Sequence, residues 1–152
     1  MSAHRTNQRK TPWRTVEGPI LIVDDDLDEA RLAKRALESA QPNPAVGVRI
    51  CSSGKDFLAY LEGKGAYEDR VAHPLPSLVL LDLKMPEMDG FEVLAWVKGQ
   101  TRYAHIPIVI LSGMENPEGL KRAYSLQARS YLFKPINMDS FRDVLTSLNI
   151  AL

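Results

Sequence analysis

The chain is predicted to form a doubly wound α/β fold, in which helices cover both faces of a five-stranded parallel sheet. Five strand signals alternate with five helix signals along the 152 residues, which is the pattern of parallel strands joined by helical crossovers. Three of the strands are uniformly apolar and two are mixed. Because edge strands are less buried than central ones, the mixed second and fifth strands predict the strand order 2-1-3-4-5.

Length and composition fit one globular domain. The sequence is 45% hydrophobic and 25% charged, and its formal net charge is zero, so neither direct nucleic-acid binding nor attraction to an anionic membrane is expected. The lone Cys51 cannot form an internal disulfide, and no apolar run is long enough for a signal peptide or a membrane span, which together favour a cytoplasmic protein. Residues 1–18 are expected to form a basic, flexible tail, 19–149 the domain, and 150–152 a short C-terminal end.

The first strand is predicted at Ile20–Val23, and a helix follows it. Helical spacing assigns the inward face of that helix to Leu32, Ala33, Ala36, Leu37 and Ala40. Pro42 and Pro44 end the helix, because proline lacks the backbone donor that a helix interior needs. In the second strand, Val46, Val48 and Ile50 alternate with Gly47 and Arg49, so one of its faces should meet water.

Ser53 and Asp56 predict a capping box for the next helix, whose inward residues are Phe57, Leu58 and Leu61. Residues 63–76 lack a clear period and contain glycine and proline, so they predict an ordered surface connection. The third strand, Leu78–Leu81, is apolar throughout, as expected for a strand covered on both faces. The third helix follows at 90–98, with Val93, Leu94 and Val97 facing inward.

The last two strands are predicted at Ile108–Leu111, after Pro107, and at Ser130–Phe133. Asn116 and Pro117 are a typical N-cap and first-turn pair for the fourth helix. Apolar residues at helical spacing mark the inward face of the fifth helix: Phe141, Val144, Leu145 and Leu148.

Polar side chains follow four of the five strands at the point where each strand ends. Asp24 and Asp25 follow the first strand, Asp82 ends the third, Ser112 follows the fourth and Lys134 follows the fifth. In an open parallel sheet, ligands bind at the carboxyl ends of the strands, where the strand order reverses. The three carboxylates are therefore expected to converge there.

This set of residues suits phosphoryl chemistry. Like charges a few ångströms apart repel unless a cation lies between them, and oxygen-only ligands select a hard ion such as Mg²⁺. A carboxylate is also a legitimate phosphoryl acceptor, which makes Asp82 the candidate. The Ser112 hydroxyl and the Lys134 ammonium would then donate to the new oxygens. Taken singly, each residue is equally well or better explained as a helix cap, a turn or a solvated loop residue. Their occurrence together, each at a strand end, favours the functional interpretation.

Four short sequences carry a family resemblance: Val23-Asp24-Asp25, Leu81 to Pro86 with Asp89-Gly90, Leu111-Ser112-Gly113, and Phe133-Lys134-Pro135. Over residues 19–149 the chain resembles the receiver domain of two-component response regulators. The resemblance implies a flavodoxin-like (βα)5 fold and a phosphorelay in which a sensor histidine kinase phosphorylates Asp82. It implies Mg²⁺ bound by Asp24, Asp25, Asp82 and the backbone carbonyl of Lys84, a switch pair of Ser112 and Tyr131, and a cis bond between Lys134 and Pro135.

A finer resemblance concerns the partners. Residues 63–76, 104–107 and 122–126 are similar to those of single-domain regulators that accompany phytochrome-type histidine kinases. This implies such a kinase as partner, together with a downstream phosphotransfer or target protein. It also favours a homodimer through the fourth helix, fifth strand and fifth helix. Lys84 departs from the family, which often has a neutral side chain there, and its ammonium is a candidate to reach the acyl phosphate.

Two other functions compete with a phospho-accepting switch. A phosphohydrolase of the haloacid-dehalogenase-like type carries a second carboxylate two residues after its nucleophile, and Lys84 occupies that position here. A degenerate receiver used as a scaffold would lack phosphorylation residues, and here all of them are present. The expected function is therefore a regulatory module without a fused output domain, and not an enzyme beyond slow self-phosphorylation and self-dephosphorylation.

Overall fold

The computed structural model describes residues 14–15, 18–40, 47–113 and 117–151. Its main sheet has five parallel strands in the order β3-β2-β4-β5-β6. Since β2 is the first strand of this sheet along the chain, this is the predicted 2-1-3-4-5 order, and it confirms the flavodoxin-like fold. The strands are β2 (Ile20–Val23), β3 (Val48–Cys51), β4 (Leu78–Asp82), β5 (Ile108–Ser112) and β6 (Ser130–Phe133).

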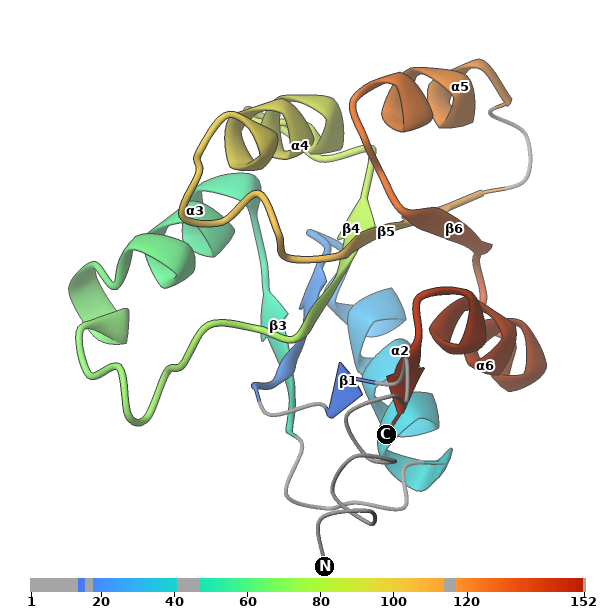
Figure 1. Ribbon diagram of the computed structural model, residues 1–152, viewed down its shortest axis with the longest axis horizontal. Helices are drawn as coiled ribbons and strands as arrows, with labels where there is room; N and C mark the ends of the chain where they lie inside the picture. Colours follow the sequence, from blue (N-terminus) through green and yellow to red (C-terminus); the bar gives the residue numbers. More distant parts are fainter. Residues whose placement is uncertain (1–13, 16–17, 41–46, 114–116, 152) are drawn as a thin grey trace, which may run out of the picture.

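Helices cover both faces of this sheet, as Figure 1 shows. Helices α2 (Leu27–Ala40) and α6 (Met138–Ser147) lie on one face, and α3 (Gly54–Glu62), α4 (Gly90–Lys98) and α5 (Pro117–Ser125) lie on the other. Each helical layer buries its own apolar cluster against the sheet, with Leu37 and Phe141 in one and Phe57 and Val93 in the other. Apolar surface buried on both faces stabilises the fold by about 25 cal/mol for each Å² removed from water. This burial holds the strand ends in fixed positions.

The helix start at Ser53 follows the prediction only in part. The Ser53 side chain accepts the Asp56 backbone N–H, as a capping residue should. The Asp56 carboxylate, however, accepts from the N–H of Ser52 rather than from that of Ser53. Helix α5 begins at Pro117, as expected, whereas the predicted cap Asn116 lies outside the described residues.

The inward face of α2 agrees with the prediction at Ala33 and Leu37 and differs from it at Leu32. Leu32 was expected to pack inward, but 63% of it is exposed. The buried residues are Ala30, Ala33 and Leu37, which lie at i, i+3 and i+7. Successive side chains along a helix are rotated by about 100° from one another. Because α2 packs with Ala30 against the sheet, Leu32 is turned away from it. The side chain of Ala40 and residue Val46 lie outside the described part of the chain.

The connection between α3 and β4 is ordered, as predicted, and contains the short 3-10 helix η1 (Gly65–Tyr67). Gly63 ends α3 in the left-handed conformation, at φ 67°, which glycine adopts without steric cost. The Arg70 guanidinium then donates to the carbonyls of Tyr60, Leu61 and Tyr67. Two of these bonds go to carbonyls in the last turn of α3 and the third to a carbonyl of η1, so Arg70 ties the connection to the end of the helix.

Sequence patterns did not indicate a second, two-stranded sheet. Strand β1 (Arg14–Thr15) pairs in parallel with β7 (Ile150–Ala151), so two residues of the expected tail lie beside the C-terminal end. Ile150 is buried, and the Gly18 backbone is hydrogen-bonded to the Ser77 hydroxyl. The rest of the expected tail, up to residue 17, lies outside the described residues.

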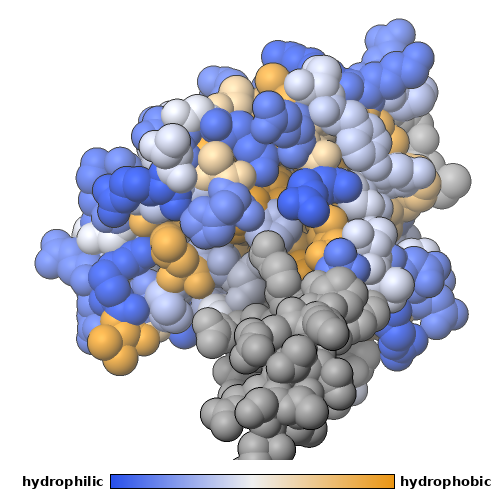
Figure 2. All heavy atoms as spheres, viewed as in Figure 1, coloured by the Kyte–Doolittle hydropathy of each residue, from blue (hydrophilic) through white to orange (hydrophobic). Residues whose placement is uncertain are grey.

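Figure 2 shows a face on which hydrophilic residues predominate and hydrophobic ones form small separate patches. This distribution follows from the two apolar layers, which take most large hydrophobic side chains away from water. No helix in the described part of the chain is long and apolar enough to cross a membrane.

Candidate functional site

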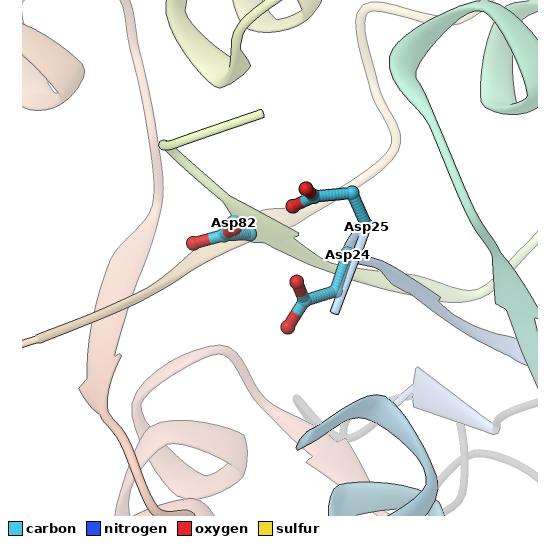
Figure 3. Close-up of side chains that lie close together, drawn as sticks. All are labelled: Asp24, Asp25 and Asp82. Atoms are coloured by element: carbon cyan, nitrogen blue, oxygen red, sulfur yellow. The ribbon is translucent and has the colours of Figure 1, made fainter. Parts of the chain in front are cut away.

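Three carboxylates converge at the carboxyl ends of β2 and β4. Asp24, Asp25 and Asp82 each place one oxygen so that all three oxygens lie within 4.8 Å of one another, and Figure 3 shows the side chains facing a common space. Asp24 and Asp82 are buried, whereas Asp25 is exposed. The register that pairs Val23 with Leu81 brings these strand ends to the same level of the sheet.

Lys134 reaches the same cluster from the end of β6. Its Nζ donates to Asp24 Oδ2 at 3.0 Å and lies 3.2 Å from Asp82 Oδ1. The side chain is mostly buried, so these pairs are screened less by water than surface pairs are. Three carboxylates against one ammonium leave an excess of negative charge.

The pKa values of these groups reflect both their burial and their charged neighbours. Burial raises the pKa of Asp82 to about 6; the Lys134 charge works against this shift, and the Asp24 charge adds to it. A backbone hydrogen bond from Lys84 also favours the ionised form of Asp82. Burial alone would lower the pKa of Lys134, but the hydrogen bond to Asp24 and the charges of Asp82 and Asp24 raise it. Lys134 is therefore held as an ammonium.

The donor set fits a hard divalent cation. Oxygens from three carboxylates are the ligands that such cations prefer, and the excess negative charge favours a cation over a neutral ligand. Lys84 was expected to supply the fourth ligand through its backbone carbonyl. It is the second residue after β4, and its side chain is exposed. Among the described residues its ammonium forms no ion pair, so its reach toward Asp82 remains a prediction.

Ser112 and Tyr131 lie on neighbouring strands, and among the described residues no hydrogen bond joins either side chain to the carboxylates. Ser112 ends β5 and is buried, and its hydroxyl donates to the adjacent Gly113 carbonyl at 3.3 Å. Tyr131 lies on β6 with 37% of its surface exposed, and its ring packs edge-on against Tyr124 and at a tilt against Phe133. The Tyr131 ring is therefore turned outward in this structure.

Two backbone features fix the end of β6. The Lys134 N–H donates to the Ser112 carbonyl at 2.9 Å, which continues the pairing of β5 and β6 beyond Phe133. The Lys134–Pro135 peptide bond is cis, as the resemblance implied.

Sequence reasoning missed one charged neighbour of the site. Glu29, in the first turn of α2, places Oε2 3.6 Å from Lys134 Nζ. Its position one turn after the Asp24-Asp25-Asp26 run was the available signal, but acidic residues are common in the first turn of a helix for dipole reasons alone. A cavity of about 400 Å³ opens beside Glu29 and Lys134, and the exposed Leu32 lines it.

Comparisons with known proteins point to one family. The family model described as "Response regulator receiver domain" matches residues 20–146. The probable methanogenesis regulatory protein FilR2 of Methanothrix harundinacea is 36% identical over 124 residues, 81% of this chain and 76% of that protein. Response regulator Rcp1 of Synechocystis is 34% identical over 126 residues, 82% of this chain and 82% of that protein.

Three solved structures are similar in both sequence and fold. The bacteriophytochrome response regulator AtBRR is 36% identical, with a TM-score of 0.77 over 88% of this chain and 94% of that one. The phosphorylated form of the cyanobacterial phytochrome response regulator RcpA is 32% identical, with a TM-score of 0.70 over 84% and 89%. The Mn²⁺-bound form of Rcp1 is 31% identical, with a TM-score of 0.68 over 86% and 88%.

Proposed function

Because the chain belongs to the response regulator receiver domain family, we propose that it is a phospho-accepting signalling switch in which Asp82 receives the phosphoryl group from a sensor histidine kinase. The observation that carries this proposal is the position of Asp82, which shares one space with Asp24 and Asp25 and contacts the Lys134 ammonium. A phosphorylated relative of the same fold, RcpA, supports it. The proposed domain is residues 19–149, acting in the cytoplasm.

In the proposed transfer, an Asp82 carboxylate oxygen attacks phosphorus and forms a new oxygen–phosphorus bond. The nitrogen–phosphorus bond of the donor phosphohistidine breaks, and its electron pair stays on the leaving imidazole. Lys134 and Ser112 donate to the oxygens of the transferred group, because both stand on strand ends beside Asp82.

Asp24, Asp25, Asp82 and the Lys84 carbonyl are proposed to hold Mg²⁺. When bound there, the ion neutralises the charge of the carboxylates and of the incoming phosphoryl oxygens. The Mn²⁺-bound form of the relative Rcp1 supports a divalent metal, and the oxygens of the incoming phosphoryl group, which Mg²⁺ commonly takes as ligands, favour that ion.

The proposed switch couples Ser112 to Tyr131. Phosphoryl oxygens on Asp82 would draw the Ser112 hydroxyl toward them and leave space into which the outward Tyr131 ring turns. A near-complete shift between two conformations requires differential binding of about 5 kcal/mol. Ser112→Ala protein is therefore expected to accept phosphate but to couple it poorly to partner binding.

The partners are proposed to be a phytochrome-type kinase, a downstream phosphotransfer or target protein, and a second copy of the chain. Similarity to the bacteriophytochrome regulator AtBRR supports the kinase type. The homodimer would use the face of α5, β6 and α6, where Tyr124 and Tyr131 are exposed. Residues such as Phe141 and Ile150 are buried and do not contribute to it. Sedimentation as a monomer at tens of micromolar, with and without phosphate, would exclude this dimer.

The test of the proposed function is incubation with Mg²⁺ and acetyl phosphate, followed by intact mass measurement. A switch gains the mass of one phosphoryl group and releases acetate, and Asp82→Asn protein gains nothing. Sustained hydrolysis of many phosphoesters would instead indicate a phosphohydrolase. An unchanged mass of the wild-type protein would indicate a scaffold.

A further inference from the structure

We propose that Glu29 is a positioning residue, which holds the Lys134 ammonium on the α2 side of the site and competes for it with the phosphoryl group on Asp82. The inference rests on the proposed function. It concerns the balance between the unphosphorylated and phosphorylated states rather than the acceptor itself.

Three carboxylates surround the Lys134 ammonium. Asp24 Oδ2 lies 3.0 Å from Nζ, Asp82 Oδ1 3.2 Å and Glu29 Oε2 3.6 Å. Nζ donates a hydrogen bond to Asp24, whereas Asp82 and Glu29 attract it as ion-pair partners. The ammonium is thus already drawn toward three carboxylates before any phosphoryl group arrives.

Glu29 differs from the other two carboxylates in what phosphorylation does to it. Asp82 becomes an acyl phosphate, and Asp24 belongs to the three-carboxylate cluster that suits a divalent cation. Glu29 lies outside that cluster and keeps its charge. Of the three carboxylates, only Glu29 therefore pulls on Lys134 from outside the reacting centre.

The position of Glu29 is fixed by the start of α2. The Asp26 carboxylate accepts the backbone N–H groups of Asp28 and Glu29, which caps the helix. Glu29 thus stands on a rigid helix turn, with about half of its side chain exposed, and points at a mostly buried ammonium.

Phosphoryl oxygens on Asp82 need the donors of Lys134. The Glu29 charge attracts the ammonium away from these oxygens, so Glu29 opposes the phosphorylated state. The Glu29 side chain is about half exposed, and ion pairs with such a partner have modest strength, which corresponds to an effect of about threefold on the phosphorylated-to-unphosphorylated ratio.

The experiment compares Glu29→Gln with Asp28→Asn. Both substitutions remove one negative charge from the same helix turn, but Asp28 forms no ion pair with Lys134 among the described residues. Full-length proteins are incubated with Mg²⁺ and acetyl phosphate, and the steady-state phosphorylated fraction is measured by intact mass. Glu29→Gln is expected to raise the phosphorylated-to-unphosphorylated ratio about threefold more than Asp28→Asn does. Glu29→Asp, which keeps the charge on a shorter stem, should lie between wild type and Glu29→Gln.

A second measurement tests the resting contact without phosphorylation. The nitrogen resonance of the Lys134 ammonium should move in Glu29→Gln protein and stay in place in Asp28→Asn protein. Equal phosphorylated ratios in the two variants, or an unmoved Lys134 resonance in Glu29→Gln, would overturn the role of Glu29 and leave Asp82 phosphorylation intact. A wild-type protein that takes up no phosphate would overturn the proposed function itself.

Discussion

Two polar clusters in this molecule combine acidic and basic side chains and differ in how completely their polar groups find hydrogen-bond partners. The acceptor site comprises Asp24, Asp25, Asp82 and Lys134. The loop cluster, which ties the α3–β4 connection to α3, comprises Arg49, Asp56, Tyr60, Tyr67 and Arg70.

In the loop cluster, the strongly polar groups find matching partners. Arg70 donates to three carbonyls, the Tyr67 hydroxyl donates to Asp56 at 2.8 Å, and the Tyr60 hydroxyl donates to the Pro74 carbonyl at 2.8 Å. Arg49 donates to the Ala72 carbonyl and to the Tyr60 hydroxyl. A satisfied network of this kind holds one arrangement of the chain.

The acceptor site lacks such matching. Three carboxylates share the space in front of one ammonium, and burial raises the pKa of Asp82 to about 6. Polar groups that all have partners therefore hold a segment in place. An excess of like charge instead produces a repulsion that a bound cation or a new set of hydrogen-bond donors can relieve. Magnesium dependence should therefore separate the two clusters.

The largest effect is expected from Lys134→Met. Removing the ammonium leaves the buried carboxylates of Asp24 and Asp82 uncompensated, which should lower the free energy of unfolding by about 3 kcal/mol in metal-free buffer. Millimolar Mg²⁺ should restore most of that loss, because the cation replaces the missing charge. Urea unfolding with and without Mg²⁺ measures both values, and an equal loss under the two conditions would contradict the account.

Arg70→Met should have a smaller effect that Mg²⁺ does not change. The substitution keeps much of the packing but removes three hydrogen bonds from a charged donor, at a cost of about 2 kcal/mol. Arg142→Met is the control, since its described contact is an exposed pair with Asp139 and should be worth less than about 0.5 kcal/mol. Phosphorylation of Arg70→Met protein should match that of wild type. A Mg²⁺-dependent loss would mean that the two clusters are coupled.

Two buried tyrosines extend the comparison to single hydroxyl groups. The Tyr60 hydroxyl has partners, whereas the Tyr103 hydroxyl is the one buried side-chain polar atom without a hydrogen-bond partner in the described part of the chain. Tyr60→Phe should lower the free energy of unfolding by about 1 kcal/mol, and Tyr103→Phe should leave it unchanged or raise it by up to about 1 kcal/mol. Thermal and urea unfolding check both values. Equal losses would show that Tyr103 is as well satisfied as Tyr60.

The smallest effect on stability is expected from Asp25→Asn. Asp25 is exposed and contributes mainly repulsion to the metal-free protein, so its neutral variant should be no less stable than wild type. Its affinity for Mg²⁺ should fall about tenfold or more, because one charged ligand is lost. Titration calorimetry measures the affinity. An unchanged value would remove Asp25 from the proposed metal site.

The sheet order could be predicted because it depends on how apolar each strand is, which can be read from a few neighbouring residues. The convergence of Asp24, Asp25 and Asp82 followed from the same order, since strand ends at one edge must meet. Leu32 was placed wrongly because the inward face of α2 depends on how that helix docks on the sheet, and a shift of one residue moves a side chain to another face.

The β1–β7 pair and the contact of Glu29 with Lys134 depend on residues far apart in the sequence. No local pattern of hydrophobicity encodes such contacts. They form only once the fold brings the first turn of α2 beside the residue that follows β6, and β1 beside β7.

Reductive mapping of the phosphate tests the central claim most directly. Wild-type protein is incubated with Mg²⁺ and acetyl phosphate, treated with borohydride, which converts an aspartyl phosphate to homoserine, and digested for peptide sequencing by mass spectrometry. The account predicts homoserine at position 82 and unmodified aspartate at positions 24 and 25, with no homoserine in the Asp82→Asn control. Homoserine at position 24 or 25, or its absence from position 82 in a protein that has gained phosphate, would contradict it.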